Sequence, residues 1–93
     1  MNGYAISFDM DIDALRQFYG EPYNPAYAEI RSLMLSSGFY WIQGSVYVTP
    51  GDLATMFKAI EKLKNIEWFR LSVRDIRGFK VEEWSDFTSL FKS

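Results

Sequence analysis

Three aspartates spaced two residues apart are the groups in this chain that could most readily do chemistry. Asp9, Asp11 and Asp13 follow YAISF, a run typical of a buried strand. Carboxylates bind Mg²⁺ and act as general acids or bases. The spacing imitates a calcium-binding EF-hand loop, but Ala14 and Gly20 stand where that loop requires glycine and glutamate. We therefore assign Asp9 to a candidate site and expect the other two to begin a helix, whose positive end favours acidic residues.

The composition excludes several kinds of catalysis. The chain has no histidine and no cysteine, so an imidazole base, a thiol nucleophile and a zinc–thiolate site are impossible. A formal net charge of −2 predicts no general attraction to nucleic acid, so a polyanion would need a local basic patch. With no leader and no apolar run near the roughly 18 residues of a membrane span, we expect a cytoplasmic protein without a membrane partner.

The elements that must position these groups follow from hydrophobic spacing and from turn residues. We expect a strand at 3–8, a helix at 11–19, a helix at 24–38, strand-like residues at 39–49, a helix at 53–65 and a strand at 71–81. Residues 39–49 form either a tight hairpin around Gln43-Gly44 or one long bent strand with a bulge. Thr49 and Asp52 resemble a capping box, and the spacing of Trp84, Phe87 and Phe91 indicates a short helix or a docking arm.

The order of these elements is β-α-β-β-α-β, which predicts the fold. It is the order of the ferredoxin-like α+β fold, an antiparallel sheet with helices on one face, and we expect one such domain over residues 1–93. The other sheet face needs cover. Because 48% of the residues are hydrophobic and 18% are aromatic, we expect a homodimer formed through the sheets.

Four segments carry a family resemblance: FDMD, YGEPYNPAY, GFYWIQGSVYV and IEWFRLSVRDIRGFKVEEWSDFT. Together they resemble the virulence-associated protein D (VapD) family along nearly the whole chain. That family is similar in fold to the CRISPR-associated Cas2 proteins, which also pair a first-strand aspartate with a Gln-x-Ser-Val-aromatic segment. The resemblance implies a dimeric endoribonuclease, at least sometimes the toxin of a toxin–antitoxin pair with an antitoxin partner, with Asp9, Ser45 and Asp75 as the functional positions.

How Asp9 would act is left open by the sequence. An ordinary aspartate has a pKa of about 3.9 and is a poor base near neutral pH. Two symmetry-related Asp9 carboxylates in a dimer could share a proton, or they could hold Mg²⁺ or another divalent cation whose bound water reacts. In a third route the 2′-hydroxyl of the RNA attacks, and the protein orients it and stabilises the charge on phosphorus.

Ser45 and Asp75 each have a structural alternative. Without histidine Ser45 lacks the usual base, so we expect it to donate a hydrogen bond to the scissile phosphate; otherwise it is a turn residue. Asp75 and Arg77 occupy the alternate, mostly apolar positions of 71–81, so Asp75 is either half of a structural ion pair or a second carboxylate near Asp9. We expect the first and last strands not to be neighbours within one chain, so the second role would require convergence at strand ends or across subunits.

One basic cluster could contact RNA, and aromatic residues that could stack on bases lie near it in the sequence. It consists of Arg70, Arg74, Arg77 and Lys80. The alternative is a charged strand edge that discourages aggregation. We therefore predict a homodimeric endoribonuclease that binds RNA. The rival is a non-catalytic dimeric scaffold for nucleic acid or protein, and a weaker alternative is DNA cleavage.

Overall fold

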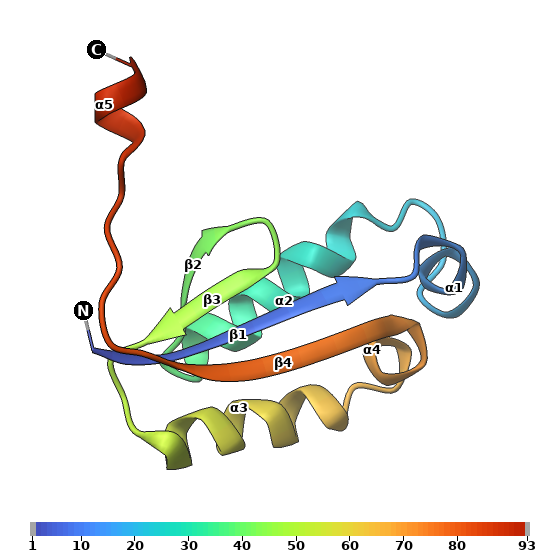
Figure 1. Cartoon of the computed structure of the whole chain (residues 1–93). Helices are drawn as coiled ribbons and strands as arrows, with labels where there is room; N and C mark the ends of the chain where they lie inside the picture. Colours follow the sequence, from blue (N-terminus) through green and yellow to red (C-terminus); the bar gives the residue numbers. More distant parts are fainter. Residues whose placement is uncertain (1, 93) are drawn as a thin grey trace.

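A computed structural model describes residues 2–92 of the chain. Its strands form one four-stranded antiparallel sheet, and two longer helices pack against it (Figure 1). In chain order the elements are β1 (Gly3–Met10), α1 (Ile12–Phe18), α2 (Asn24–Ser36), β2 (Tyr40–Gln43), β3 (Val46–Thr49), α3 (Leu53–Lys64), α4 (Glu67–Ser72), β4 (Val73–Val81) and α5 (Thr88–Lys92).

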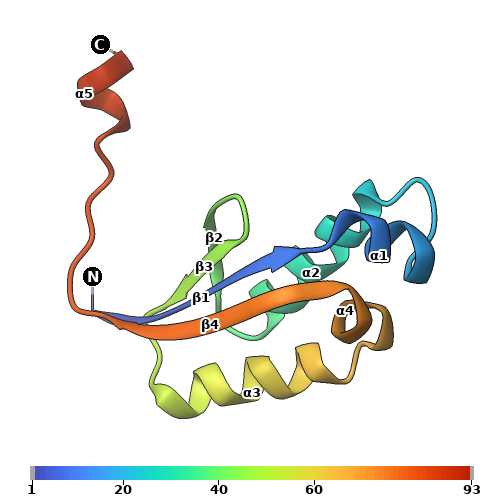
Figure 2. The same ribbon diagram turned by 45° about the vertical axis from the view of Figure 1, so that its right-hand side comes forward.

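The sheet has the strand order β2-β3-β1-β4, so β1 lies in the middle between two antiparallel neighbours. This order and the position of α2 and α3 on one side of the sheet confirm the ferredoxin-like fold (Figures 1 and 2). Our expectation that the first and last strands are not neighbours was wrong. The α2 crossover leads from β1 to the edge strand β2, and β3 returns to pair with β1. The α3 crossover then carries the chain past β1, so β4 pairs with β1 on its other side.

The core lies between the sheet and the helices. Ile6 and Phe8 of β1 pack there with Met34 of α2 and Leu63 of α3, and all four side chains are buried. Successive side chains of a strand point to opposite faces, so the odd positions of β1 lie on the face away from α2 and α3. We call this the open face. Through the strand register it holds Ala5, Ser7, Asp9, Val46, Val48, Asp75, Arg77, Phe79 and Val81.

Several local predictions are confirmed and others are corrected. Asp11 caps α1, because its Oδ1 accepts a hydrogen bond from Ala14 N at 3.1 Å. Asp52 caps α3 itself and accepts from Thr55 N at 3.0 Å; it is not the closing acid of a box that begins at Thr49. Residues 39–49 form a hairpin, and its pairing also contains a register shift between Trp41 and Gln43.

The last strand begins later than predicted. Leu71 belongs to the short helix α4, and β4 runs from Val73 to Val81. The prediction joined the two because the odd positions continue their apolar pattern through residue 71. Beyond β4, residues 82–92 form a segment that stands away from the body in both ribbon views, and α5 lies near its end (Figures 1 and 2). Within residues 2–92 no helix has the length and apolarity needed to cross a membrane.

Candidate active site

Asp9 and Asp75 are direct cross-strand partners. Their Cα atoms are paired in the β1–β4 register, so both side chains lie on the open face. Directly opposed Cβ atoms in antiparallel strands are about 5 Å apart, so a single chain brings these carboxylates together. Phe8 anchors this segment from the other face, where its ring packs edge-to-face on Phe69 at 5.3 Å between centroids. Because like charges directly opposite each other destabilise a sheet, the pairing calls for a reason other than stability.

Arg77 partly compensates the charge of this pair. Its Nη1 donates to Asp75 Oδ1 at 2.8 Å, so the predicted ion pair is present. The side chain of Asp75 is 37% exposed and that of Arg77 is 73% exposed, so this is not the buried pair that an inward-facing strand position would give. Asp75 therefore fills both roles that the sequence left open: it belongs to an ion pair and it lies beside Asp9.

A β-bulge follows the two aspartates. Asp9 pairs with Asp75, but Met10 pairs with Val73, so Arg74 is an extra residue in β4. Bulges bend and twist a strand and often occur next to active sites. Asp11 N donates to Ser72 O at 2.8 Å beyond the bulge and closes this end of the sheet. The backbone that carries the two carboxylates is therefore held on both sides of the bulge.

Ser45 lies at the same end of the sheet, in the turn between β2 and β3. Its backbone oxygen accepts a hydrogen bond from Phe8 N at 3.2 Å, directly before Asp9 in β1. Gly44 has φ of +50°, a left-handed conformation that glycine adopts without strain. The three predicted positions thus come from β1 and from segments that flank it on both sides, as Figure 1 shows for the strands.

Two side chains that support this turn, Trp41 and Arg31, were not predicted from the sequence. Trp41 Nε1 donates to Gly44 O at 2.8 Å, and the Arg31 guanidinium lies 3.7 Å from the centre of the Trp41 ring. Arg31 also acts on Tyr47: burial raises the pKa of the Tyr47 hydroxyl, and the hydrogen bond and charge of Arg31 partly offset that rise. Arg31 is on α2, so no local motif could have linked it to the turn.

The predicted basic cluster is not one surface. Arg77 lies on the open face, Arg74 is the bulge residue, Lys80 pairs with Tyr4 on the opposite face, and Arg70 is in the last turn of α4. Sequence proximity suggested a patch, but strand alternation separates its members. Of the four, Arg77 has the side chain that is bonded to a candidate site residue among the described residues.

The described residues of one chain do not by themselves supply a complete metal site. The described residues contain no group of three or more histidine, cysteine, aspartate or glutamate side chains that could hold a metal ion. Mg²⁺ is often bound through one or two carboxylates together with substrate phosphate oxygens and water. Asp9 fits that requirement when substrate or a second Asp9 supplies further oxygens, whereas Asp75 already binds Arg77.

The fold and this site together define a ferredoxin-like protein with opposed carboxylates at the end of its central strand pair. A family model described as CRISPR associated protein Cas2 matches residues 2–88. The chain is 56% identical to "Endoribonuclease VapD" of Dichelobacter nodosus, over 96% of this chain and 97% of that protein. It is 55% identical to "Endoribonuclease VapD" of Helicobacter pylori (97% and 99% covered) and 36% identical to the Haemophilus influenzae protein of that name (97% and 99%). The chain therefore belongs to the VapD family within the broader Cas2 group.

Proposed function

We propose that this protein is an endoribonuclease whose site is centred on Asp9 and Asp75. The observation that carries the proposal is the direct register of the two carboxylates on the open face. A purely structural role does not account for two opposed negative charges at the end of a strand pair. The names of the relatives supply the reaction class, because each of the three described above is called an endoribonuclease.

In the simplest mechanism, the 2′-oxygen of the RNA attacks the neighbouring phosphorus and the bond to the 5′-oxygen of the next nucleotide breaks. Asp9 orients the 2′-hydroxyl and accepts its proton, and the leaving 5′-oxygen takes a proton from solvent. Arg77 stabilises the extra negative charge on phosphorus, since its exposed guanidinium lies on the same face. Ser45 donates a hydrogen bond to a phosphate oxygen, consistent with its turn beside β1.

A homodimer through the open faces is part of the proposal. Apart from Ser7, Arg77 and the two carboxylates, the side chains on this face are apolar, and Phe79 is 49% exposed. Apolar surface of this kind is typical of subunit interfaces. A two-fold axis through the interface would bring the Asp9 carboxylates of both copies to one groove, which could then hold RNA and, where used, a divalent cation. That cation would be held by Asp9 and phosphate oxygens, and it would neutralise charge on the phosphate.

The decisive test is cleavage of an end-labelled RNA by wild type and Asp9→Ala, each with and without EDTA. We expect Asp9→Ala to lower the rate constant by about 10²–10⁴-fold, the usual contribution of a general base. Persistence of wild-type cleavage in EDTA supports attack by the 2′-hydroxyl, and its loss supports the cation. A substrate with 2′-deoxyribose at the cleaved position would remain intact in the first case. Equal cleavage by both proteins would remove Asp9 from the mechanism.

The biological role that we propose is that of the toxin in a toxin–antitoxin pair. Support comes from the family resemblance, and the expected consequence is growth arrest by expressed wild type but not by Asp9→Ala. The rival role, a non-catalytic scaffold, predicts binding of RNA or protein without any cleavage. Parallel assays with RNA and DNA of one sequence would also test the DNA alternative.

A further inference from the structure

Gln43 is a polar residue of the hairpin to which the proposed reaction assigns no part, although it begins the Gln-x-Ser-Val-aromatic segment that contains Ser45. It is the last residue of β2 and pairs with Val46 across the turn. Directly paired residues of antiparallel strands carry their side chains on the same face, so Gln43 lies on the open face with Val46. Its side chain is exposed at the tip of an edge strand.

The strand register places Gln43 beside the row of the sheet that contains the carboxylates. Across the open face, in the order β2-β3-β1-β4, its own row is Gln43, Val46, Ser7 and Arg77. The next row toward the bulge contains Asp9 and Asp75. With strands about 4.8 Å apart and a rise of about 3.3 Å per residue, Gln43 lies about 10 Å across the sheet and about 7 Å along it from Asp9. A nucleotide whose ribose is at Asp9 can therefore extend its base over Val46 toward Gln43.

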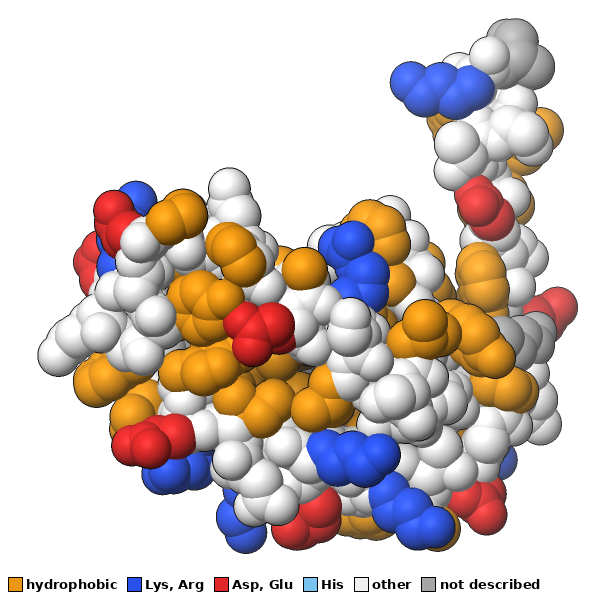
Figure 3. Space-filling model, turned by 180° about the vertical axis from the view of Figure 1, so that it is seen from behind, with side chains coloured by type: hydrophobic (Ala, Val, Ile, Leu, Met, Phe, Trp, Pro, Cys, Tyr) orange, Lys and Arg blue, Asp and Glu red, His pale blue; other side chains and the backbone are white. Residues whose placement is uncertain are grey.

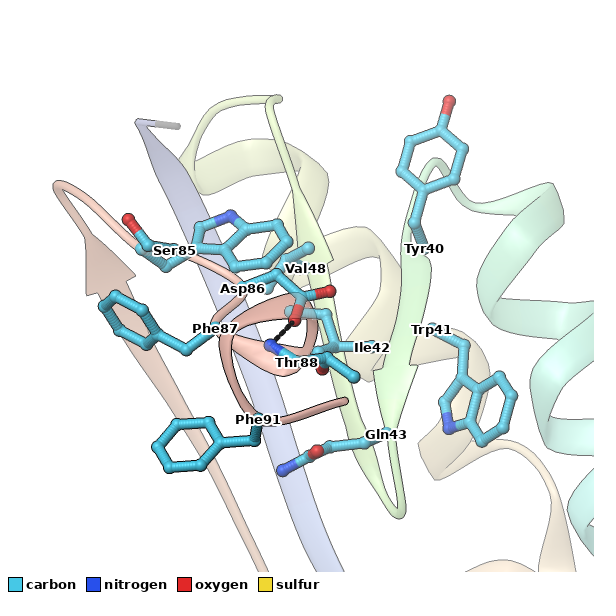
Figure 4. A pocket seen from close by; sticks show the side chains of 11 residues that line it. Tyr40, Trp41, Ile42, Gln43, Val48, Ser85, Asp86, Phe87, Thr88 and Phe91 are labelled. Carbon is cyan, nitrogen blue, oxygen red and sulfur yellow. Dashed lines mark hydrogen bonds between the residues drawn. The ribbon is translucent and has the colours of Figure 1, made fainter. Parts of the chain in front are cut away.

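The side chain of Gln43 is available for such a contact. Among the described residues its amide has no hydrogen-bond partner, and it lines an open groove of about 760 Å³ beside β2. Figure 4 shows that Gln43 and Trp41 leave the hairpin on opposite sides. Trp41 supports the turn through Gly44 O and the Arg31 guanidinium. The turn is therefore held in place without the Gln43 amide, which is left to bind a ligand.

The charge of the molecule gives little help in selecting one RNA sequence over another. The formal net charge is −2, and on the face shown in Figure 3 the Lys and Arg side chains are interspersed with acidic ones. Contacts to the phosphate backbone position a nucleic acid but carry no sequence information. A side-chain amide differs, because it offers N–H donors beside a carbonyl acceptor and so matches a base edge that carries an acceptor beside a donor.

We propose that Gln43 is a specificity-determining residue, which reads the base of the nucleotide whose 2′-hydroxyl lies at Asp9. The inference rests on the proposed function, because it uses the same site. Unstacked bases of single-stranded RNA expose their edges to hydrogen bonding, and the Gln43 amide binds one such edge at two points. Val46 contacts the base from the sheet. Since Ser45 follows Gln43 in the same hairpin, recognition of the base and contact with the neighbouring phosphate depend on one turn.

The test maps every cleavage position in an RNA pool with a randomised single-stranded segment, by sequencing the products of wild type, Gln43→Ala and Gln17→Ala. We expect wild type to prefer one base directly 5′ of the cut by about tenfold or more, the size of a good two-point contact. Gln43→Ala should reduce this preference to within about twofold by slowing cleavage at the preferred base. Gln17→Ala, the same change at an exposed residue of α1, is the control and should leave the preference unaltered.

A second variant tests the chemistry of the contact. Gln43→Glu replaces the amide by a carboxylate, which accepts hydrogen bonds but donates none. Uracil is the one RNA base without an exocyclic amino group, so this variant should cut most slowly where uracil lies directly 5′ of the cut.

Three results would overturn the proposal: a wild type without base preference, a preference that Gln43→Ala leaves unchanged, or equal slowing of all sites in that variant. The last would show that Gln43 only positions the turn. Asp9-dependent cleavage together with any of these results retains the nuclease and rejects this inference alone. Cleavage that does not depend on Asp9 rejects the proposed function itself.

Discussion

The two ends of the sheet are built in opposite ways. At one end, Asp9 and Asp75 lie on a backbone that is fixed by the bulge, by the hydrogen bond from Asp11 to Ser72 and by the packed ring of Phe8. At the other end, residues 82–92 leave the body with exposed apolar side chains. Charged groups on a rigid frame suit chemistry, whereas exposed apolar groups suit association. Under the proposed function, the reaction and the association of copies would use different ends of the sheet.

The largest expected effect comes from the carboxylate pair itself. Asp9→Asn should reduce RNA cleavage by about 10²–10⁴-fold, because the amide cannot accept the proton. The same change should leave the melting temperature unchanged or raise it, because it removes a like charge opposite Asp75. Cleavage assays and calorimetry on one preparation measure both effects. A variant that is inactive and also strongly destabilised would indicate that this end of the sheet serves the fold.

Arg77 should have the next largest effect. Arg77→Met removes the cation that is bonded to Asp75, and we expect cleavage to fall by about tenfold. The stability loss should stay below about 1 kcal/mol, since the ion pair is largely exposed. Arg77→Lys is the matched control and should recover part of the activity by keeping the charge. If Arg77→Met cleaves RNA as fast as wild type at every salt concentration, this cation has no role in the reaction.

Trp41 tests whether the turn is positioned for the reaction. Trp41→Phe keeps a ring beneath Arg31 but removes the hydrogen bond to Gly44 O. We expect kcat to fall several-fold with KM nearly unchanged, because the turn carrying Ser45 loses one of its supports. Tyr40→Phe, in the same strand, should leave both constants at their wild-type values. A change confined to KM would instead assign Trp41 to RNA binding.

The smallest effect is expected at the cap of α3. Hydrogen bonds from Thr55 hold the pKa of Asp52 below its ordinary value. A carboxyl with a lowered pKa in the folded state stabilises the fold above its unfolded pKa, and this contribution disappears as the pH falls through the folded pKa. Asp52→Ala should therefore lower the melting temperature by a few degrees near pH 7, and by less near pH 3. A difference that is constant with pH would exclude the charge as its cause.

How much the sequence predicted depends on the range of the interaction. The strand that leads to Asp9 and the helix that begins at Asp11 and Asp13 follow from neighbouring residues, and both are confirmed. The pairing of Asp9 with Asp75 depends on the strand order, so the family resemblance suggested both positions but not that they are cross-strand partners. Arg74 shows the same limit, because a bulge depends on the register of two strands. The link from Arg31 to Trp41 joins a helix to a hairpin, and no spacing rule along the chain encodes it.

The pairing of Gly3 with Val81 has a practical consequence for anyone who prepares this protein. The chain therefore enters and leaves the sheet at one place, where residues 82–92 begin. A purification tag fused ahead of residue 2 would emerge there, at the end of the sheet away from Asp9 and Asp75. If copies associate through the open face as proposed, a tag at this place would change oligomer size in solution without changing turnover per folded chain.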